Sequence, residues 1–257
     1  MAAPFRTYLD LCNTILRELN EVELTSTTFT SALGIQKFVK DTINRAYFDI
    51  CNAEDKWNFL SVGDPLNDYY GNAVIETVAG TRWYDLQSAQ TLLNQYSFID
   101  YDNIVLTEEG VSGKTAPFEV FKLQPLSLSN WQRLYGVQEA KDKSDTQSYG
   151  IPRRVIRGPA NDKIGFSPIP DGVYKVYFYA YAQPTELTAS TDTVVFPKQY
   201  TSVLLARARY YIYQFKDNIA QSQLALDEYK KGLQNMADQL NSPQPEYMSD
   251  VRFTYLY

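Results

Sequence analysis

Two segments near the start of the chain carry apolar residues at helical spacing. The first spans residues 5–20, and its apolar positions are Tyr8, Leu9, Cys12, Ile15, Leu16 and Leu19. The second spans residues 35–52, with Ile35, Phe38, Val39, Ile43, Ala46, Tyr47 and Ile50 on one face. Apolar residues that recur every three or four positions predict amphipathic helices packed on a core. The hydroxyl-rich stretch 25–31 between them is expected to cap the second helix.

The middle of the chain changes to β-branched and aromatic runs separated by turns. The strand candidates are Val74–Val78, Trp83–Leu86, Phe98–Thr107, Phe118–Leu123, Arg153–Arg157, Lys163–Ser167, Val173–Ala182 and a short edge at Val194–Phe196. Short strands at this spacing predict an antiparallel sandwich or a small barrel. The polar stretch 138–150 is interpreted as an exposed loop inside this region and not as a domain boundary.

The segment Lys163–Tyr181 predicts a hairpin, because Asp171-Gly172 supplies turn geometry between two strand-like runs. Successive strand residues point to opposite faces. One face of the second run carries Tyr174, Val176, Phe178 and Ala180, and we expect it to be buried. The other face carries Tyr177, Tyr179 and Tyr181. Tyrosine is apolar along its ring and polar at its tip, so this tyrosine face is expected to be half exposed.

Two further helices and an apolar tail complete the pattern. Pro197 is suited to the first turn of a helix that runs to Phe215, and a second helix covers Ile219–Leu240. Pro243 and Pro245 then force an extended path. The last twelve residues include Tyr247, Met248, Val251, Phe253, Tyr255, Leu256 and Tyr257, which is more apolar than a solvated tail should be.

These elements predict an α+β fold. Residues 1–58 and 197–242 are expected to form a four-helix bundle from both ends of the chain. Residues 59–196 are expected to form an inserted antiparallel β region of sandwich or barrel type. Residues 243–257 are expected to form an extended C-terminal tail.

Composition removes whole classes of function. The 257 residues include 21 tyrosines and no histidine, and the net charge is −6. Without histidine there is no histidine general base, no Ser-His triad and no His-liganded metal. The negative charge argues against a protein that wraps nucleic acid.

Cys12 and Cys51 lie in helical patterns and are predicted to be buried thiols. No apolar run approaches the ~18 residues of a membrane-spanning helix, so no membrane association is expected.

No complete catalytic or binding motif is present. The sequence Gly110–Thr115 resembles the end of a phosphate-binding loop, but Glu108 stands where that motif needs its first glycine, and Pro117 obstructs the following helix. The pair Asp142 and Asp145 lacks the glycine and terminal glutamate of a calcium loop. We therefore predict no catalytic residue, no cofactor and no metal ion.

Two weaker signals leave alternatives open. Trp57, Trp83 and Trp131 have rings that stack on sugars in other proteins, and carboxylate pairs are frequent in this acidic chain. Arg153, Arg154 and Arg157 form the only cationic cluster outside a helix. On a strand, Arg153 and Arg157 share a face that Arg154 does not. A local or inter-subunit salt bridge is the favoured interpretation of these arginines, and DNA contact is the minor one.

The order of parts resembles a known family. The segments that carry the resemblance are the helix Leu11–Leu19, the step Trp57-Asn-Phe59 from helix into β structure, Gly165–Tyr174, Tyr179-Ala-Tyr181, Pro184, Leu187, Asp192 and Phe196–Tyr200 leading into a helix. Together they are similar to the head-to-tail adaptor of tailed bacteriophages, called tail tubular protein A in short-tailed phages. The resemblance implies a helical bundle with a β insertion, a ring of twelve copies under the portal, and no catalytic residue.

The resemblance implies a virion protein of the neck and tail that is assembled in the host cytoplasm. Its ring would connect the portal to the next tail or nozzle protein, and double-stranded DNA would pass through without sequence-specific binding. A negative chain suits such a lumen because like charges repel. The tail residues 247–257 are expected to dock on the portal, and Tyr177, Tyr179 and Tyr181 to contact neighbouring subunits. The alternatives are a carbohydrate-binding or carbohydrate-degrading tail protein that recognises a receptor, and a stopper or tail-completion ring.

Overall fold

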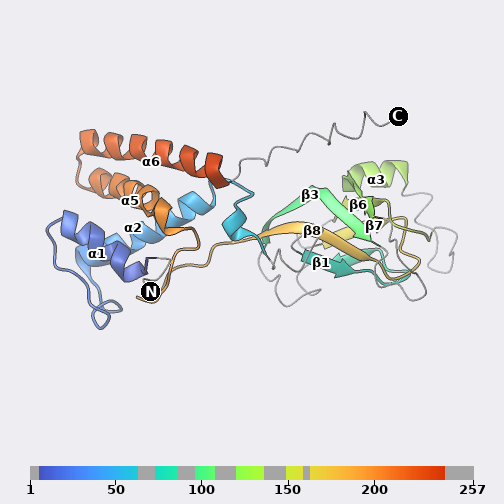
Figure 1. The fold of residues 1–257 in the computed structure, drawn as a ribbon, viewed down its shortest axis with the longest axis horizontal. Helices are drawn as coiled ribbons and strands as arrows, with labels where there is room; N and C mark the ends of the chain where they lie inside the picture. Colours follow the sequence, from blue (N-terminus) through green and yellow to red (C-terminus); the bar gives the residue numbers. More distant parts are fainter. Residues whose placement is uncertain are drawn as a thin grey trace, which may run out of the picture. The chain divides into compact units, whose positions relative to one another are not determined.

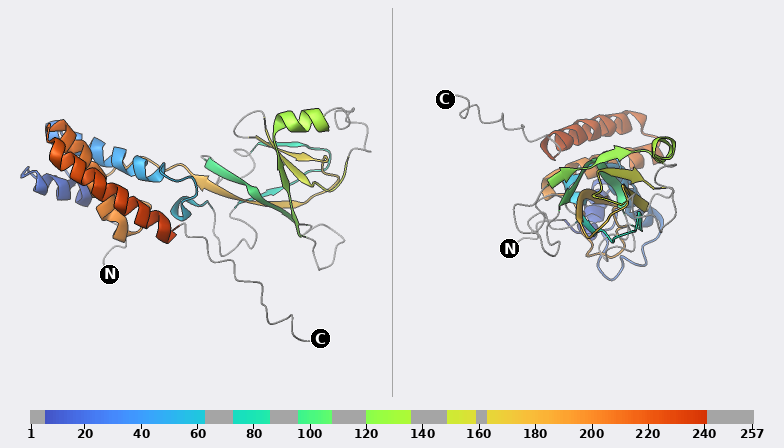
Figure 2. Two further views of the ribbon diagram at one scale, coloured as in Figure 1. Left: turned by 90° about the horizontal axis from the view of Figure 1, so that it is seen from above. Right: turned by 90° about the vertical axis from the view of Figure 1, so that its right-hand side faces the viewer.

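The computed structural model describes residues 6–62, 73–85, 96–107, 120–135, 149–158 and 163–240. The chain divides into two compact units, one formed by residues 1–60 with 184–257 and the other by residues 61–183. The long helices belong to the first unit and the strands to the second (Figures 1 and 2). The predicted α+β class is therefore confirmed. Among the described residues, no helix is both long enough and apolar enough to cross a membrane.

The helical unit contains the helices that the periodicity predicts. They are α1 (Tyr8–Glu18), α2 (Gly34–Cys51), α5 (Thr201–Phe215) and α6 (Ile219–Leu240), with the short 3-10 turns η1 (Asn58–Leu60) and η3 (Lys198–Tyr200). Helix α1 starts from a capping box, in which the Thr7 hydroxyl accepts from the Asp10 N–H at 3.2 Å and the Asp10 carboxylate accepts from the Thr7 N–H at 3.4 Å.

The hydroxyl-rich stretch before α2 does not cap that helix, so this prediction is wrong. Leu33 is the N-cap residue of α2 and makes no side-chain cap. The hydroxyls instead close a local turn, where Thr25 and Thr28 bond to each other's backbone and side-chain atoms. Short polar side chains compete for nearby backbone groups in this way, because local partners cost little chain entropy.

The core of the helical unit combines residues of the predicted apolar stripes with Leu11, Phe29, Trp57 and Phe196, which lie outside them. Helix α2 packs against α1 and α5, and α5 packs against α6. The largest fully buried side chains in it are Tyr8, Leu11, Ile15, Leu16, Phe29, Ile43, Tyr47, Ile50, Trp57 and Phe196. Burying a large apolar side chain of this kind contributes roughly 1.5–3 kcal/mol.

The chain rejoins the helical unit at residue 184, earlier than the predicted boundary at 197. Leu187, Val194 and Phe196 are buried. The amide of Asn44 on α2 donates to the Leu187 carbonyl at 2.8 Å and accepts from the Leu187 N–H at 3.1 Å. The predicted edge strand Val194–Phe196 is not a strand. Its Phe196 ring lies instead 6.0 Å from the ring of Tyr47 on α2.

The β unit contains two sheets of four described strands each. The first has the order β1 (Ala73–Glu76), β8 (Lys175–Ala182), β3 (Tyr96–Thr107) and β4 (Val120–Lys122). The second has the order β2 (Trp83–Asp85), β7 (Lys163–Ser167), β6 (Arg154–Arg157) and β5 (Gln124–Leu126). All pairs are antiparallel except β5 with β6, which is parallel. The sequence patterns did not predict β5, a three-residue strand that contains proline.

The predicted hairpin of Lys163–Tyr181 is wrong in its pairing. Both strands exist, but β7 pairs with β2 and β6 in the second sheet, whereas β8 pairs with β1 and β3 in the first. The connection at Asp171 and Gly172 therefore carries the chain from one sheet to the other. Tyr174 anchors this crossing: its N–H donates to the Thr77 hydroxyl at 2.8 Å and its own hydroxyl to the Asp171 carboxylate at 2.6 Å.

Both sheets contribute to one core. It includes Ile75, Tyr84, Ile99, Ile104, Leu106, Leu123, Val155, Ile164, Phe166, Tyr174, Val176, Phe178 and Ala180. The predicted buried face of β8 is thus confirmed. On the second sheet, Gly165 of β7 pairs with Trp83 of β2, and a Cβ added at Gly165 would lie 2.5 Å from the Trp83 ring. This close approach explains why the strand carries a glycine there.

Candidate interaction surfaces

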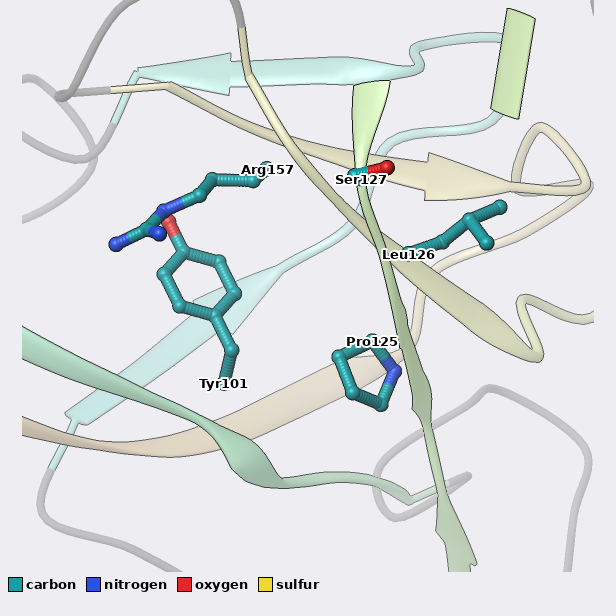
Figure 3. Close-up of a pocket in the computed structure, with 5 residues that line it drawn as sticks. All are labelled: Tyr101, Pro125, Leu126, Ser127 and Arg157. Carbon is teal, nitrogen blue, oxygen red and sulfur yellow. The ribbon is translucent and has the colours of Figure 1, made fainter. Parts of the chain in front are cut away.

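A small open pocket lies where β3 meets the edge of the second sheet. Its volume is about 210 Å³, and its lining residues are Tyr101, Pro125, Leu126, Ser127 and Arg157. Tyr101 comes from the irregular part of β3, where its pairing with β8 shifts register between Asp100 and Val105. The other residues come from β5, from the residue after it, and from the last position of β6. Figure 3 shows the Arg157 side chain beside the Tyr101 hydroxyl, with the Pro125 ring across the pocket.

Arg157 gives this pocket a positive border. Its guanidinium carbon lies 5.1 Å from the centre of the Tyr101 ring. Burial raises the pKa of Tyr101, and the nearby Arg157 charge only partly offsets that rise. Tyr101 is therefore neutral at ordinary pH, so the positive charge of Arg157 is not cancelled by a phenolate.

The two other arginines of the predicted cluster also lie over aromatic rings. The Arg154 guanidinium is 4.1 Å from the centre of the Tyr135 ring, and that of Arg153 is 5.7 Å from the centre of the Phe121 ring. Within the part of the chain that the structure describes, none of the three arginines forms an ion pair. The predicted salt bridge, local or inter-subunit, is thus not formed among the described residues, and both alternatives stay predictions.

Helix α3 (Leu128–Leu134) brings aromatic rings to the same sheet. Ser127 caps the helix by accepting from the Asn130 N–H at 3.3 Å, and α3 packs against β6. Trp131 meets Trp83 edge to face, with ring centres 6.2 Å apart, and the Arg82 guanidinium lies 4.5 Å from the Trp131 ring centre. Trp57, the third sugar-stacking candidate, is fully buried in the helical unit and cannot contact a ligand.

One end of the helical unit exposes large apolar side chains. They are Val22, Leu33, Phe215, Ile219 and Leu224, whose exposed fractions run from 64% to 81%. The Phe38 and Phe215 rings lie 4.5 Å apart, and the Gln36 amide donates to the Val22 carbonyl, so these residues gather where α2 and α6 begin and α5 ends. We call this set the apolar end. Exposed apolar patches of this kind are typical of protein–protein contacts.

A polar network ties α2, α5 and α6 together. The Asp49 carboxylate of α2 accepts from the Arg207 Nε at 2.7 Å and from the Tyr211 hydroxyl at 2.5 Å. The Arg207 guanidinium also lies 4.8 Å from the centre of the Tyr229 ring on α6. Burial opposes the charge on Arg207, but the hydrogen bond and the charge of Asp49 outweigh it, so the Arg207 pKa is raised. This network fixes the helices that carry the apolar end.

The three tyrosines predicted as subunit contacts differ in exposure. Tyr177 and Tyr181 are buried, with 6% and 8% of their surfaces exposed, whereas Tyr179 is 39% exposed. Their strand β8 lies between β1 and β3 and carries side chains that are covered on both faces. Of these residues, Tyr179 alone offers substantial surface to a partner. The predicted portal-binding residues 247–257 lie outside the described residues, as do Gly110–Thr115, Asp142 and Asp145.

Sequence reasoning missed two of these surfaces. The apolar end could have been noticed from Phe215 and Ile219, which flank the polar break Asp217-Asn218 on a turn where apolar residues are costly. The pocket could not have been found, because Tyr101 and Arg157 are far apart in sequence and meet only through the parallel pairing of β5 and β6 and the approach of β3.

Comparison with known proteins gives one family match. The model of the family described as SU10 adaptor protein matches residues 6–253. The match covers nearly the whole chain and includes both compact units. No individually curated protein shows a significant match.

Proposed function

Since the chain belongs to the SU10 adaptor protein family, a family of bacteriophage structural adaptors, we propose that it forms a ring that joins the portal to the tail. Double-stranded DNA passes through this ring, and the protein contacts other head and tail components in the virion. The observation that carries the proposal is the family match over both units. The function is assembly, so the ring needs specific contact surfaces and no catalytic centre.

The apolar end supports the ring. Five large apolar side chains at more than 60% exposure are costly on a monomer and gain stability when a neighbour covers them. Each fully buried side chain of this size contributes roughly 1.5–3 kcal/mol. In the proposed ring the apolar end contacts the adjacent subunit, and Tyr179 on the β unit makes a second contact with a neighbouring subunit or the next tail protein.

The proposed neck position assigns a role to the last residues of the chain. The aromatic and apolar residues Tyr247, Met248, Val251, Phe253, Tyr255, Leu256 and Tyr257 anchor the subunit to the portal. Segments that become ordered on a partner gain apolar contacts there and lose chain entropy, so they act as removable anchors. The net charge of −6 suits a passage for DNA.

Negative-stain electron microscopy of the purified protein tests the ring. The expected image is a closed ring of twelve subunits. Six subunits would favour the stopper or tail-completion alternative, and a monomer at high concentration would contradict the ring for the isolated protein. The double variant Phe215→Asp/Ile219→Asp should abolish rings, whereas the matched variant Val78→Asp, also at an exposed apolar position, should leave them intact.

Deletion of residues 246–257 tests the anchor separately. The truncated protein should still form rings and show the wild-type circular dichroism spectrum, but it should no longer co-sediment with purified portal. Normal attachment of the truncated ring would show that the anchor lies elsewhere. Tyr179→Asp should weaken ring assembly without loss of folded subunit, because this side chain is exposed in the monomer.

A further inference from the structure

The turn between α5 and α6 holds exposed apolar side chains in a defined position. The Asn218 N–H donates to the Tyr213 carbonyl at 2.9 Å, and Asp217 takes the left-handed backbone conformation with φ at 55°. This combination is the Schellman motif, which closes the end of a helix with backbone hydrogen bonds. Phe215 and Ile219 stand on either side of Asp217, with 64% and 81% of their surfaces exposed. This part of the apolar end is therefore a closed turn and not a frayed helix end.

A groove adjoins the apolar end at Leu224. It has a volume of about 390 Å³ and is lined by residues of α1, α5 and α6 that include Glu18, Arg209, Leu224, Ala225 and Glu228. The Arg209 guanidinium donates to the Glu18 carboxylate at 2.6 and 2.8 Å and lies 3.7 Å from that of Glu228, so its charge is already balanced. The groove combines apolar walls with carboxylates that can accept a hydrogen bond. Tyrosine fits such a site, because its ring is apolar and its hydroxyl donates.

One segment outside the described residues has the composition of an occupant. Residues 251–257 read Val-Arg-Phe-Thr-Tyr-Leu-Tyr, so apolar or aromatic side chains stand at every second position. In an extended segment these four side chains share one face. Two of them are tyrosines, which the groove favours. The other two, a valine and a phenylalanine, are apolar like the side chains of the apolar end.

The same segment is long enough to reach the apolar end of its own chain. Helix α6 ends at Leu240, whose carbonyl accepts from the Asn58 amide at 2.7 Å. At 1.5 Å per residue, the 22 residues of α6 place Ile219 about 32 Å from Leu240. The eleven residues from Leu240 to Val251 span about 34 Å in the polyproline II conformation, which the two prolines among them favour. Residues 251–257 can therefore lie over the turn and the groove.

We propose that residues 251–257 fold back along α6 and cover the apolar end and its groove in the free subunit. A short tether gives the segment an effective concentration in the millimolar range, so a weak contact is enough. Ordering the segment costs about as much free energy as its burial gains, so a competitor can displace it.

The competitor is the adjacent subunit, and this consequence rests on the proposed function. In the proposed ring the neighbour covers the same apolar side chains. Ring formation and the folded-back segment therefore exclude each other. A portal that takes the segment uncovers the apolar end, so subunits join the ring most readily where the portal is present.

Disulfide formation in the full-length protein locates the segment. The variant Lys216→Cys/Thr254→Cys puts one thiol beside Phe215 and the other within the segment. The matched control Glu54→Cys/Thr254→Cys puts the first thiol at an exposed position close in sequence to Asn58, where the tail begins. An undocked tail would meet this position more often than Lys216. The native thiols do not compete, because Cys12 and Cys51 are buried.

Under mild oxidation at low protein concentration, the Lys216→Cys/Thr254→Cys variant should form its monomeric disulfide about tenfold faster than the control, because docking raises the local thiol concentration. Adding Phe253→Asp/Tyr255→Asp should remove this advantage. Equal rates, or a faster control, would overturn the proposal. Disulfide-linked dimers in place of monomers would overturn the assignment to the same chain in favour of a second copy.

A hydrophobic dye, anilinonaphthalene sulfonate, tests which surface the segment covers. Deletion of residues 246–257 should raise the dye fluorescence of the subunit several-fold. The same deletion in the Phe215→Asp/Ile219→Asp background should not raise it, and circular dichroism checks that each variant is folded. No increase, or an equal increase in both backgrounds, would overturn the assignment to the apolar end.

The onset of ring assembly tests the competition. Light scattering should detect rings of the deletion variant at about tenfold lower concentration than rings of the full-length protein, because only undocked subunits associate. An equal onset would overturn the competition. Absence of rings from both proteins would contradict the proposed function, whereas the disulfide and dye results decide the docking by themselves.

Discussion

Asp49 is the residue whose removal should most clearly destabilise the helical unit without touching its apolar core. Its carboxylate is shared by the Arg207 guanidinium and the Tyr211 hydroxyl, which come from one face of α5. Asp49→Ala therefore leaves a cation without its partner and a phenol without its acceptor. The Arg207 aliphatic stem and the Tyr211 ring remain in place, so the effect reports the polar network.

The magnitude follows from how deeply the pair is buried. Breaking a fully buried ion pair by removing one partner costs about 3–5 kcal/mol, because the remaining charge is uncompensated. An exposed pair contributes about 0–1 kcal/mol. The side chains of Arg207 and Asp49 are 19% and 29% exposed, so this pair lies between the two limits. We expect Asp49→Ala to lower the free energy of unfolding by about 2–3 kcal/mol.

Urea denaturation followed by circular dichroism at 222 nm measures this change, because the long helices of the helical unit dominate that signal. Asp41→Ala is the matched control: it makes the same substitution at an exposed position of the same helix. That variant should stay within about 0.5 kcal/mol of wild type. A double-mutant cycle of Asp49→Ala with Tyr211→Phe should give a coupling of about 1 kcal/mol. Equal stability of the Asp49 and Asp41 variants would refute the reasoning.

Three further outcomes are expected. Gly165→Ala should destabilise the β unit by about 1–3 kcal/mol, because the new Cβ would lie 2.5 Å from the Trp83 ring; tryptophan fluorescence during denaturation measures it, and an unchanged midpoint would contradict the close approach. Burial raises the pKa of the Cys12 and Cys51 thiols to about 12, so a disulfide reagent at pH 8 should label no thiol in the native protein and both thiols in denaturant; rapid native labelling would show that the helical core opens. Tyr47→Phe should leave the stability within about 1 kcal/mol of wild type or raise it, because among the described residues the buried Tyr47 hydroxyl has no hydrogen-bond partner of adequate geometry, although it lies near Cys51 and Val195; a larger loss in the same urea experiment would show that this hydroxyl is bonded.

The helices could be predicted from the sequence because their signal is local. The apolar stripes of α1 and α2 repeat over several turns, and most of their positions are buried as expected. Leu9 and Leu19 are only half-buried, and Leu11, which the stripe did not include, is buried instead. Most strands were also predicted, since β-branched and aromatic runs such as that of β8 are local signals too. Element boundaries differ by a few residues where capping decides them, as at Thr7, whose side chain sets the start of α1.

Strand pairing could not be predicted, because it depends on residues far apart in sequence. The Asp171-Gly172 signal is a real turn, but the strands on its two sides find better partners in different sheets. Tyr177 and Tyr181 show the same limit: alternation predicts which face they occupy but not that they are buried, because burial depends on groups from other parts of the chain. The β5–β6 pair, and the pocket that it forms with Tyr101, also depend on contacts between residues far apart in sequence.

The two ends of the β unit are joined to each other. The Val62 N–H donates to the Ala180 carbonyl at 3.0 Å, and Ser61 forms a bridge with Tyr181. The polypeptide thus leaves this unit beside the place where it came in, as inserted domains commonly do. An inserted unit of this kind can be exchanged or omitted with little change in the distance between the two points of the helical unit that it connects. Related adaptors could therefore gain, lose or replace the whole β unit by a single recombination event while keeping the same set of helices.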